Sequence, residues 1–210
     1  MTHPDPSTAH PAASRNRLVL SLYTTAIFVS ALLLFSVQPL FTKMVLPRLG
    51  GSPAVWSVAM VFFQSLLLAG YAYAHYLMRL NNRLIAVSVH VALLLIALLT
   101  LPLSIATSWG DPPTSGYALW LLGLFVASIG LPFFALAANN PLLQAWFVRT
   151  GHPSGGDPYF LYASSNIGSF LALLSYPVLL EPMFTLRTQN LMWTAGYGLL
   201  ILLILSLIHI

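Results

Sequence analysis

The side chains that could bind a small molecule are polar residues placed inside long apolar segments. They fall into two groups, which are Asn139, Asn140 and Gln144 in one segment and Ser164, Ser165 and Asn166 in a later one. Polar groups in a bilayer are costly unless paired, so each is a functional hypothesis. Together they could line a polar vestibule that binds a small solute. The alternative is that they are buried contacts between helices, a common role for such residues in membranes.

Carboxylates are scarce and lie outside the middle of the apolar segments. The chain holds four of them: Asp5, Asp111, Asp157 and Glu181. Glu181 is predicted to form an ion pair at the outer membrane surface, with Arg48 as the first candidate partner and Lys43 or Arg187 as alternatives. Transport of a polyvalent cation would need more carboxylates than this.

The sequence lacks the residues that metal binding, cofactor binding and covalent catalysis would need. Without cysteine the chain has no disulfide, thiolate metal site or cysteine nucleophile. His90 has no second histidine or carboxylate three or four residues away, which favours a histidine bonded to another helix over a metal ligand, with a proton relay as the alternative. Gln38 and Gln64 are likewise predicted to hydrogen-bond between helices. No phosphate loop, dinucleotide fingerprint or nucleophile–base pair is present. We therefore predict no catalytic residue, no metal and no cofactor.

The composition is that of a membrane protein. Hydrophobic residues make up 58% and charged residues 6% of the chain, against roughly 25% charged residues in soluble domains. The net charge of +4 comes from basic residues at the ends of apolar segments. That arrangement predicts membrane lipid as a partner and no nucleic acid. The spans leave no room for a soluble domain of ordinary size.

The apolar segments predict an all-α fold, a polytopic membrane bundle of about six transmembrane helices. Residues 1–17 are predicted to be a disordered cytoplasmic tail and residues 18–210 the membrane domain. The last segment runs to the final residue with His209 as the one polar group at this terminus, so we expect the full gene product to be longer. The expected spans are approximately residues 18–40, 54–77, 84–105, 117–148, 159–182 and 190–210.

Breakers and small residues refine these spans. Pro39, Pro47 and the glycines that follow are expected to end the first helix, and Pro132 and Pro141 to kink the fourth. In the fifth span Ser164, Gly168 and Ala172 recur every four residues. This spacing predicts a ridge that packs closely against a neighbouring helix.

Basic residues in short loops predict the orientation. With the N-terminus in the cytoplasm, the inner side holds five of them and the outer side three. The inner residues are Arg15, Arg17, Arg79, Arg83 and Arg149, and the outer residues are Lys43, Arg48 and Arg187. We therefore expect a multi-pass protein of the inner membrane with a cytoplasmic N-terminus.

Several segments follow one another in a recognisable order. They are QPLFTKMVLPRLGGSPAVW, FFQSLLLAGYAYAH, LPFF with PLLQAWF, and DPYFLYASSNIGSFLALLSYPVLLEP. Together they resemble the membrane region of bacterial membrane-fused spermidine synthases, also described as fused major-facilitator and spermidine synthase proteins. The resemblance implies an inner-membrane domain followed by a cytoplasmic Rossmann-like aminopropyltransferase domain. That domain would move an aminopropyl group from decarboxylated S-adenosylmethionine to putrescine.

The aminopropyltransferase domain is not among these residues, so no catalytic residue is carried over. The resemblance predicts a membrane module that anchors or serves polyamine metabolism, with that domain as a partner in cis or in trans. The alternative is a transporter or half-transporter of a small solute such as a polyamine, because six spans equal half of a major-facilitator transporter. The loop with Arg79 and Arg83 lacks the glycine and aspartate of that family's loop signature.

Overall fold

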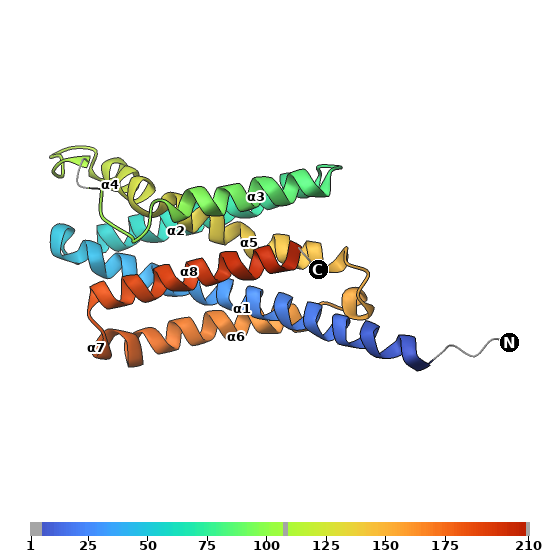
Figure 1. The fold of residues 1–210 in the computed structure, drawn as a ribbon. Coiled ribbons are helices and arrows are strands. Elements are labelled where there is room, and N and C mark those ends of the chain that lie inside the picture. The colour runs from blue at the N-terminus through green and yellow to red at the C-terminus, as the bar shows by residue number, and fades with distance from the viewer. Residues whose placement is uncertain (1–5, 107–108, 209–210) are drawn as a thin grey trace.

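The computed structural model describes residues 6–106 and 109–208, and for residues 6–13 the backbone only. Within these ranges the chain forms six helical rods and no strand (Figure 1). Five of the rods are long and apolar enough to cross a membrane. The predicted all-α membrane bundle is therefore confirmed. The rods are α1 (Pro6–Leu49), α2 (Pro53–Met78), α3 (Arg83–Leu98), α4 with η2 and α5 (Tyr117–Phe125, Val126–Gly130, Leu131–Val148), α6 with η4 and α7 (Tyr159–Ser175, Tyr176–Leu180, Glu181–Met183), and α8 (Leu186–Ile208).

The first helix is longer than the sequence predicts. α1 covers 44 residues and continues through Pro39 and Pro47, so the expected end near residue 40 is wrong. A proline removes one hydrogen bond from a helix, and within a packed membrane bundle this loss is tolerated. The helix ends just before the glycine pair that the sequence also marked as a breaker, and Gly50 has a φ of +70°, which reverses the chain. At its other end α1 begins at Pro6, inside the range 1–17 assigned to a tail, and residues 1–5 lie outside the described part.

The third helix is shorter than predicted. α3 ends at Leu98 after 16 residues, which is about 24 Å and less than the hydrocarbon thickness of about 30 Å. The expected continuous span over residues 84–105 is therefore wrong. Pro102 explains the early end, because its ring would clash with the carbonyl group of Leu98 in a continuing helix.

Residues 99–106, which follow α3, are not helical and are held by side chains of other helices. Asn190 of α8 accepts a hydrogen bond from the Leu103 N–H (3.0 Å) and donates one to the Leu103 carbonyl (2.7 Å). Ser128 of η2 accepts a hydrogen bond from the Ala106 N–H at 2.9 Å. Irregular backbone at membrane depth must find such partners within the protein.

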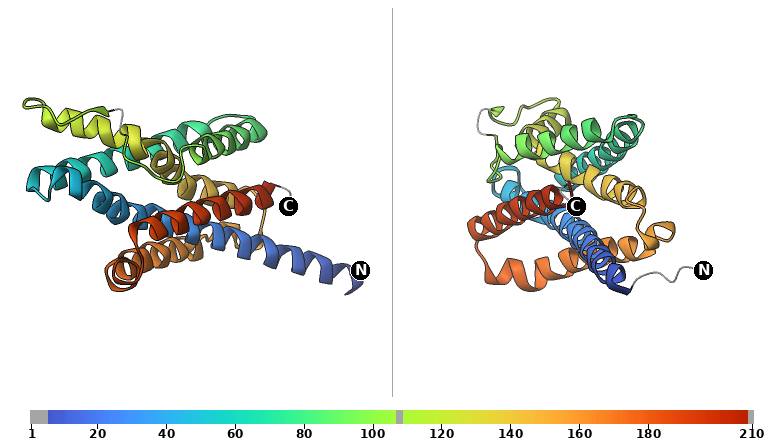
Figure 2. Two further views of the ribbon diagram at one scale, coloured as in Figure 1. Left: turned by 60° about the vertical axis from the view of Figure 1, so that its left-hand side comes forward. Right: turned by 45° about the vertical axis from the view of Figure 1, so that its right-hand side comes forward.

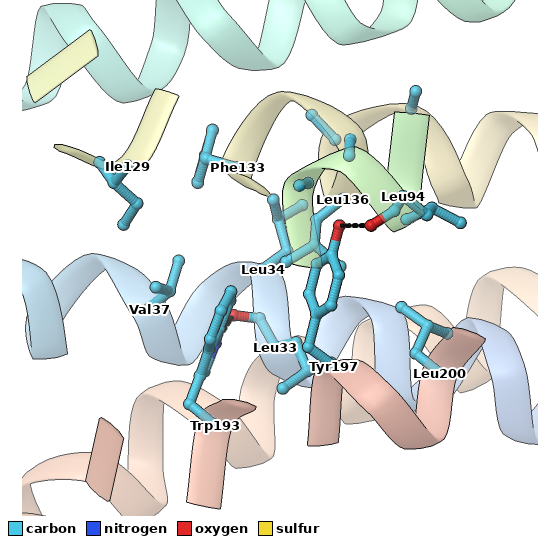
Figure 3. Close-up of a cluster of buried hydrophobic side chains, with 14 of the residues drawn as sticks. Leu33, Leu34, Val37, Leu94, Ile129, Phe133, Leu136, Trp193, Tyr197 and Leu200 are labelled. Atoms are coloured by element: carbon cyan, nitrogen blue, oxygen red, sulfur yellow. Dashed lines mark hydrogen bonds between the residues drawn. The ribbon is translucent and has the colours of Figure 1, made fainter. Parts of the chain in front are cut away.

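α1 forms the centre of the bundle. It packs against α6, α8 and α5, while α2 packs against α5 and α4, and α3 against α5 and α8. Figure 2 shows α1 passing between the neighbouring rods from two further directions. Two aromatic side chains of α8 bond this helix to two others (Figure 3). The Trp193 indole N–H donates to the Leu33 carbonyl of α1 (3.0 Å), and the Tyr197 hydroxyl donates to the Leu94 carbonyl of α3 (3.4 Å).

The predicted small-residue ridge lies at the interface between α6 and α1. Ser164, Gly168 and Ala172 are all buried. The Ser164 hydroxyl donates to the Thr24 carbonyl of α1 at 2.8 Å. A Cβ at Gly168 would lie 2.6 Å from the Phe28 carbonyl oxygen, so only glycine permits this approach. The prediction of close helix packing here is confirmed.

The two ends of the bundle differ in charge. The end at which α1 begins, which we call the basic end, also holds the loops between α2 and α3 and between α5 and α6 (Figure 1). These segments carry Arg15, Arg17, Arg79, Arg83 and Arg149 together with Asp157. The opposite end carries Lys43, Arg48 and Arg187 together with Asp111 and Glu181. The bundle therefore has a strongly positive end and a mixed one.

Candidate functional site

The two adjacent asparagines of α5 contact different helices. The Oδ1 atom of Asn139 lies 2.7 Å from Nε2 of His90 on α3. The Nδ2 group of Asn140 donates to the hydroxyl of Ser165 on α6 at 2.9 Å. Successive helical residues are separated by about 100° around the axis, so neighbouring side chains face different partners. The predicted bond of His90 to another helix is confirmed.

The remaining residues of the predicted vestibule are also spread among different surroundings. Ser164 is bonded to α1, Gln144 is half-buried one turn after Asn140, and Asn166 is exposed on the outer face of α6. Among these six residues, the one pair joined by a hydrogen bond in the described structure is Asn140 and Ser165. Four of the six residues, Asn139, Asn140, Ser164 and Ser165, therefore take part in separate contacts between helices.

A second polar cluster surrounds His90. The His90 side chain is buried, and its ring lies 5.9 Å from that of Tyr73 on α2. His90 Nδ1, Asn139 Nδ2 and the Tyr73 hydroxyl are buried and have no hydrogen-bond partner among the described atoms. In the same part of the chain, no group of three or more His, Asp or Glu side chains could hold a metal ion. The cluster is therefore a helix contact with spare hydrogen-bonding capacity.

Toward the end of the bundle opposite the basic end, a groove is lined by several polar groups that the sequence analysis did not place together. It has a volume of about 610 Å³, lies between α1, α2 and the η4 turn, and is called here the η4 groove. Its walls are mostly apolar, including Phe63 and Leu173. Its polar lining comes from Gln38, Thr42, Lys43, Gln64, Tyr176 and Glu181.

The ion pair predicted for Glu181 forms with Lys43 and not with Arg48. Both side chains are partly exposed, 35% for Lys43 and 44% for Glu181. Arg48 follows Lys43 by five residues, a rotation of about 140° around α1, and therefore leaves the face that meets α7. Arg48, the first candidate, is therefore the wrong partner, and Lys43, one of the two alternatives, is the right one.

Tyr176 provides a buried hydroxyl group in the wall of the η4 groove. Its side chain is 4% exposed, and its hydroxyl has no hydrogen-bond partner among the described atoms. The residue begins the π-helical turn η4, a type of turn frequent at functional sites. Pro177 follows and cannot donate to the carbonyl group of Leu173 four residues earlier. The wall of the groove thus holds a buried hydroxyl group that has no hydrogen-bond partner among the described atoms.

Gln38 and Gln64 line this groove instead of bonding between helices. The Gln38 amide is 3.5 Å from the Leu34 carbonyl of its own helix, and Gln64 is exposed. The predicted bonds between helices are not found for these two residues in the described structure. Both are polar side chains within apolar helices, which was the signal that could have linked them to one site.

The η4 groove is suited to binding rather than to covalent chemistry. It offers an ammonium and a carboxylate group at one end, two hydroxyls and two amides along its length, and apolar walls. A few placed polar groups in an apolar pocket are typical of small-molecule sites. Its polar lining contains no activated nucleophile next to a base. A small molecule with polar and apolar parts fits this lining.

Comparison with the models of known families, with curated proteins and with solved structures found no match to this chain.

Proposed function

We propose that the chain is the membrane module of a protein resembling membrane-fused spermidine synthases, and that it holds an aminopropyltransferase at the bacterial inner membrane. The supporting observation is that polar side chains inside the bundle are used in bonds between helices. Ser164 bonds α6 to α1, Asn140 bonds α5 to α6, and Trp193 bonds α8 to α1. Such bonds stabilise a fixed helical arrangement, which suits an anchor.

The charge difference between the two ends supports an orientation with the basic end in the cytoplasm. Five arginines lie there, against three basic residues at the opposite end, and basic loops remain in the cytoplasm. Reporter fusions test this orientation. Alkaline phosphatase inserted at Asp111 is expected to be active, and green fluorescent protein inserted at Ser154 is expected to fluoresce. The reverse pattern would contradict the proposed orientation.

The anchoring role is tested by binding. The full chain is reconstituted into nanodiscs, and the purified aminopropyltransferase of the same organism is titrated onto them. We expect saturable binding to nanodiscs that contain the chain and none to empty ones. Equal binding to both would refute the anchoring role, even where the membrane insertion itself is correct.

The η4 groove favours a second candidate function, in which the chain binds and moves a small amine-bearing solute. The Glu181 carboxylate would accept the ammonium group after exchange with Lys43, and the walls near Phe63 and Leu173 would contact the methylene chain. The Tyr176 hydroxyl would accept a second hydrogen bond within the groove. Side chains of these types bind linear amines without covalent chemistry.

Flux measurements test this second candidate. Proteoliposomes containing the chain are loaded with labelled putrescine or spermidine, and efflux is compared with that from empty liposomes. We expect Glu181→Gln to abolish the flux and Tyr176→Phe to reduce it, whereas Asn166→Leu, outside the groove, leaves it unchanged. Flux that is unaffected by both groove substitutions would exclude the η4 groove as the pathway.

A further inference from the structure

A polar cavity at the basic end joins three parts of the chain that are distant in sequence. It has a volume of about 200 Å³ and lies between the start of α1, the start of α3 and the loop after α5. Arg15 and Arg83 line it from α1 and α3, and Asn16, Thr150 and His152 complete its polar wall. The cavity therefore carries two guanidinium groups from two helices.

The loop after α5 is fastened to α1 by His152. Its Nε2 group donates to the Asn16 carbonyl at 3.1 Å, and its Nδ1 atom accepts from the Ser154 N–H at 3.0 Å. Gly151 has a φ of +71°, which allows the loop to turn back toward α1. The cavity wall is therefore fixed by hydrogen bonds on both ring nitrogens.

The positive charge of this cavity is not neutralised by the described acidic residues. The one ion pair in the described part of the chain is Lys43 with Glu181, at the opposite end. Among the residues that the structure describes, Asp157 is the acidic residue of the basic end, and its carboxylate accepts the N–H group of Tyr159. Arg149 donates to the Met78 carbonyl instead of a carboxylate. Within residues 6–106 and 109–208, no carboxylate compensates the positive charge that Arg15 and Arg83 bring to the cavity.

An apolar cavity adjoins the polar one. It has a volume of about 270 Å³, and the two cavities share Tyr23, Arg83 and Leu207. Its other walls include Val87 and Trp146. A ligand that fills both cavities must carry an anionic group beside an apolar chain.

We propose that these adjoining cavities bind an anionic phospholipid. Its phosphate lies between Arg15 and Arg83, and one acyl chain enters the space beside Val87 and Trp146. Guanidinium groups match phosphate oxygens in charge and in hydrogen-bond geometry. A zwitterionic lipid carries an ammonium group next to its phosphate, which the two arginines repel. The site therefore selects lipids by net charge.

The proposal is tested by lipid competition. The purified, delipidated chain is exposed to equal amounts of phosphatidylglycerol and phosphatidylcholine, and bound lipid is counted by native mass spectrometry. We expect a roughly 25-fold excess of bound phosphatidylglycerol, because each of the two arginines contributes a factor of about five. Arg83→Gln and Arg15→Gln are each expected to reduce this preference by about that factor.

Arg17→Gln is the matched control, because it removes the same charge from the same helix two residues away from the cavity-lining Arg15. This variant is expected to keep the lipid preference. If Arg83→Gln on α3 does not give a monodisperse protein, the lipid preference is measured with Arg15→Gln, which changes α1 instead.

Three results would overturn the proposal. They are equal binding of the two lipids to the wild-type chain, an equal loss of preference in Arg17→Gln and Arg15→Gln, and displacement of phosphatidylglycerol by millimolar inorganic phosphate. The last result would assign the site to a free anion, because a phosphate without an acyl chain makes no use of the apolar cavity.

Discussion

The contact of α6 with α1 at Gly168 allows a sharp test of the packing. A Cβ added there would lie 2.6 Å from the carbonyl oxygen of Phe28 and 3.3 Å from Cβ of Ala31. The first neighbour is helix backbone, which cannot rotate away as a side chain can. Gly168→Ala must therefore move the whole of α6 outward from α1. Overpacking of this kind costs about 1–3 kcal/mol.

A second effect of the same substitution has the opposite sign. Alanine in a helix is more favourable than glycine by about 0.5–1 kcal/mol. Gly198→Ala isolates this term, because nothing lies within 4 Å of the added Cβ on α8. The difference between the two variants therefore reports the packing cost alone. We expect it to be about 1–3 kcal/mol in favour of Gly198→Ala.

The assay is thermal unfolding of each purified variant in the same detergent, followed by tryptophan fluorescence and by the monodisperse fraction in size-exclusion chromatography. A cost of 1 kcal/mol lowers the Tm of a chain of this size by about 2–4 °C. Gly168→Ala is expected to melt below the wild type and Gly198→Ala at or above it. Equal Tm values for the two variants would refute the close packing of α6 on α1.

Further predictions follow from single contacts. Asn190→Leu removes both partners of the Leu103 backbone and is expected to lower the free energy of unfolding by about 1–3 kcal/mol, whereas Asn166→Leu, on the exposed face of α6, leaves the Tm unchanged; equal Tm values for the two would contradict the role of Asn190. Exchanging Lys43 and Glu181 in a double charge reversal keeps the free energy of unfolding within about 1 kcal/mol of the wild type, and a larger loss in thermal unfolding would show that more than the ion pair is involved. Trp193→Phe keeps the ring but loses the indole N–H, so we expect a loss of about 1 kcal/mol in thermal unfolding, and an unchanged Tm would contradict it.

The fold class could be predicted because it depends on a strong and repeated signal. Long apolar segments with few charges cross membranes as helices, whatever their neighbours are. The ridge of Ser164, Gly168 and Ala172 could be predicted for a similar reason, since a spacing of four places these residues on one helix face. Both inferences need local sequence only.

Helix ends could not be predicted as well, because the same residue acts differently in different surroundings. Pro39 lies inside a continuous helix, whereas Pro102 follows the early end of one. After that early end, Asn190 satisfies the Leu103 backbone from a position 87 residues further along the chain. Local sequence contains no record of such a partner.

The η4 groove could not be predicted from the sequence for a related reason. Tyr176 reads as an ordinary apolar residue, and its unpaired hydroxyl becomes notable only when α1 and α2 are placed beside it. The choice between Lys43 and Arg48 as partner of Glu181 depends on the rotation of α1 relative to α7. In contrast, the divergence of Asn139 and Asn140 could have been foreseen, because adjacent helical residues differ by about 100° in direction.

The length of α1 has a mechanical consequence. Its 44 residues extend about 66 Å, roughly twice the thickness of a hydrocarbon layer. Fitting that length entirely inside the layer would need a tilt of about 60°, beyond the range of about 0–40° seen for transmembrane helices. Part of this helix must therefore extend beyond the hydrocarbon layer. A force applied to this protruding part would be transmitted along one continuous helix to the contacts that α1 makes with α6 and α8.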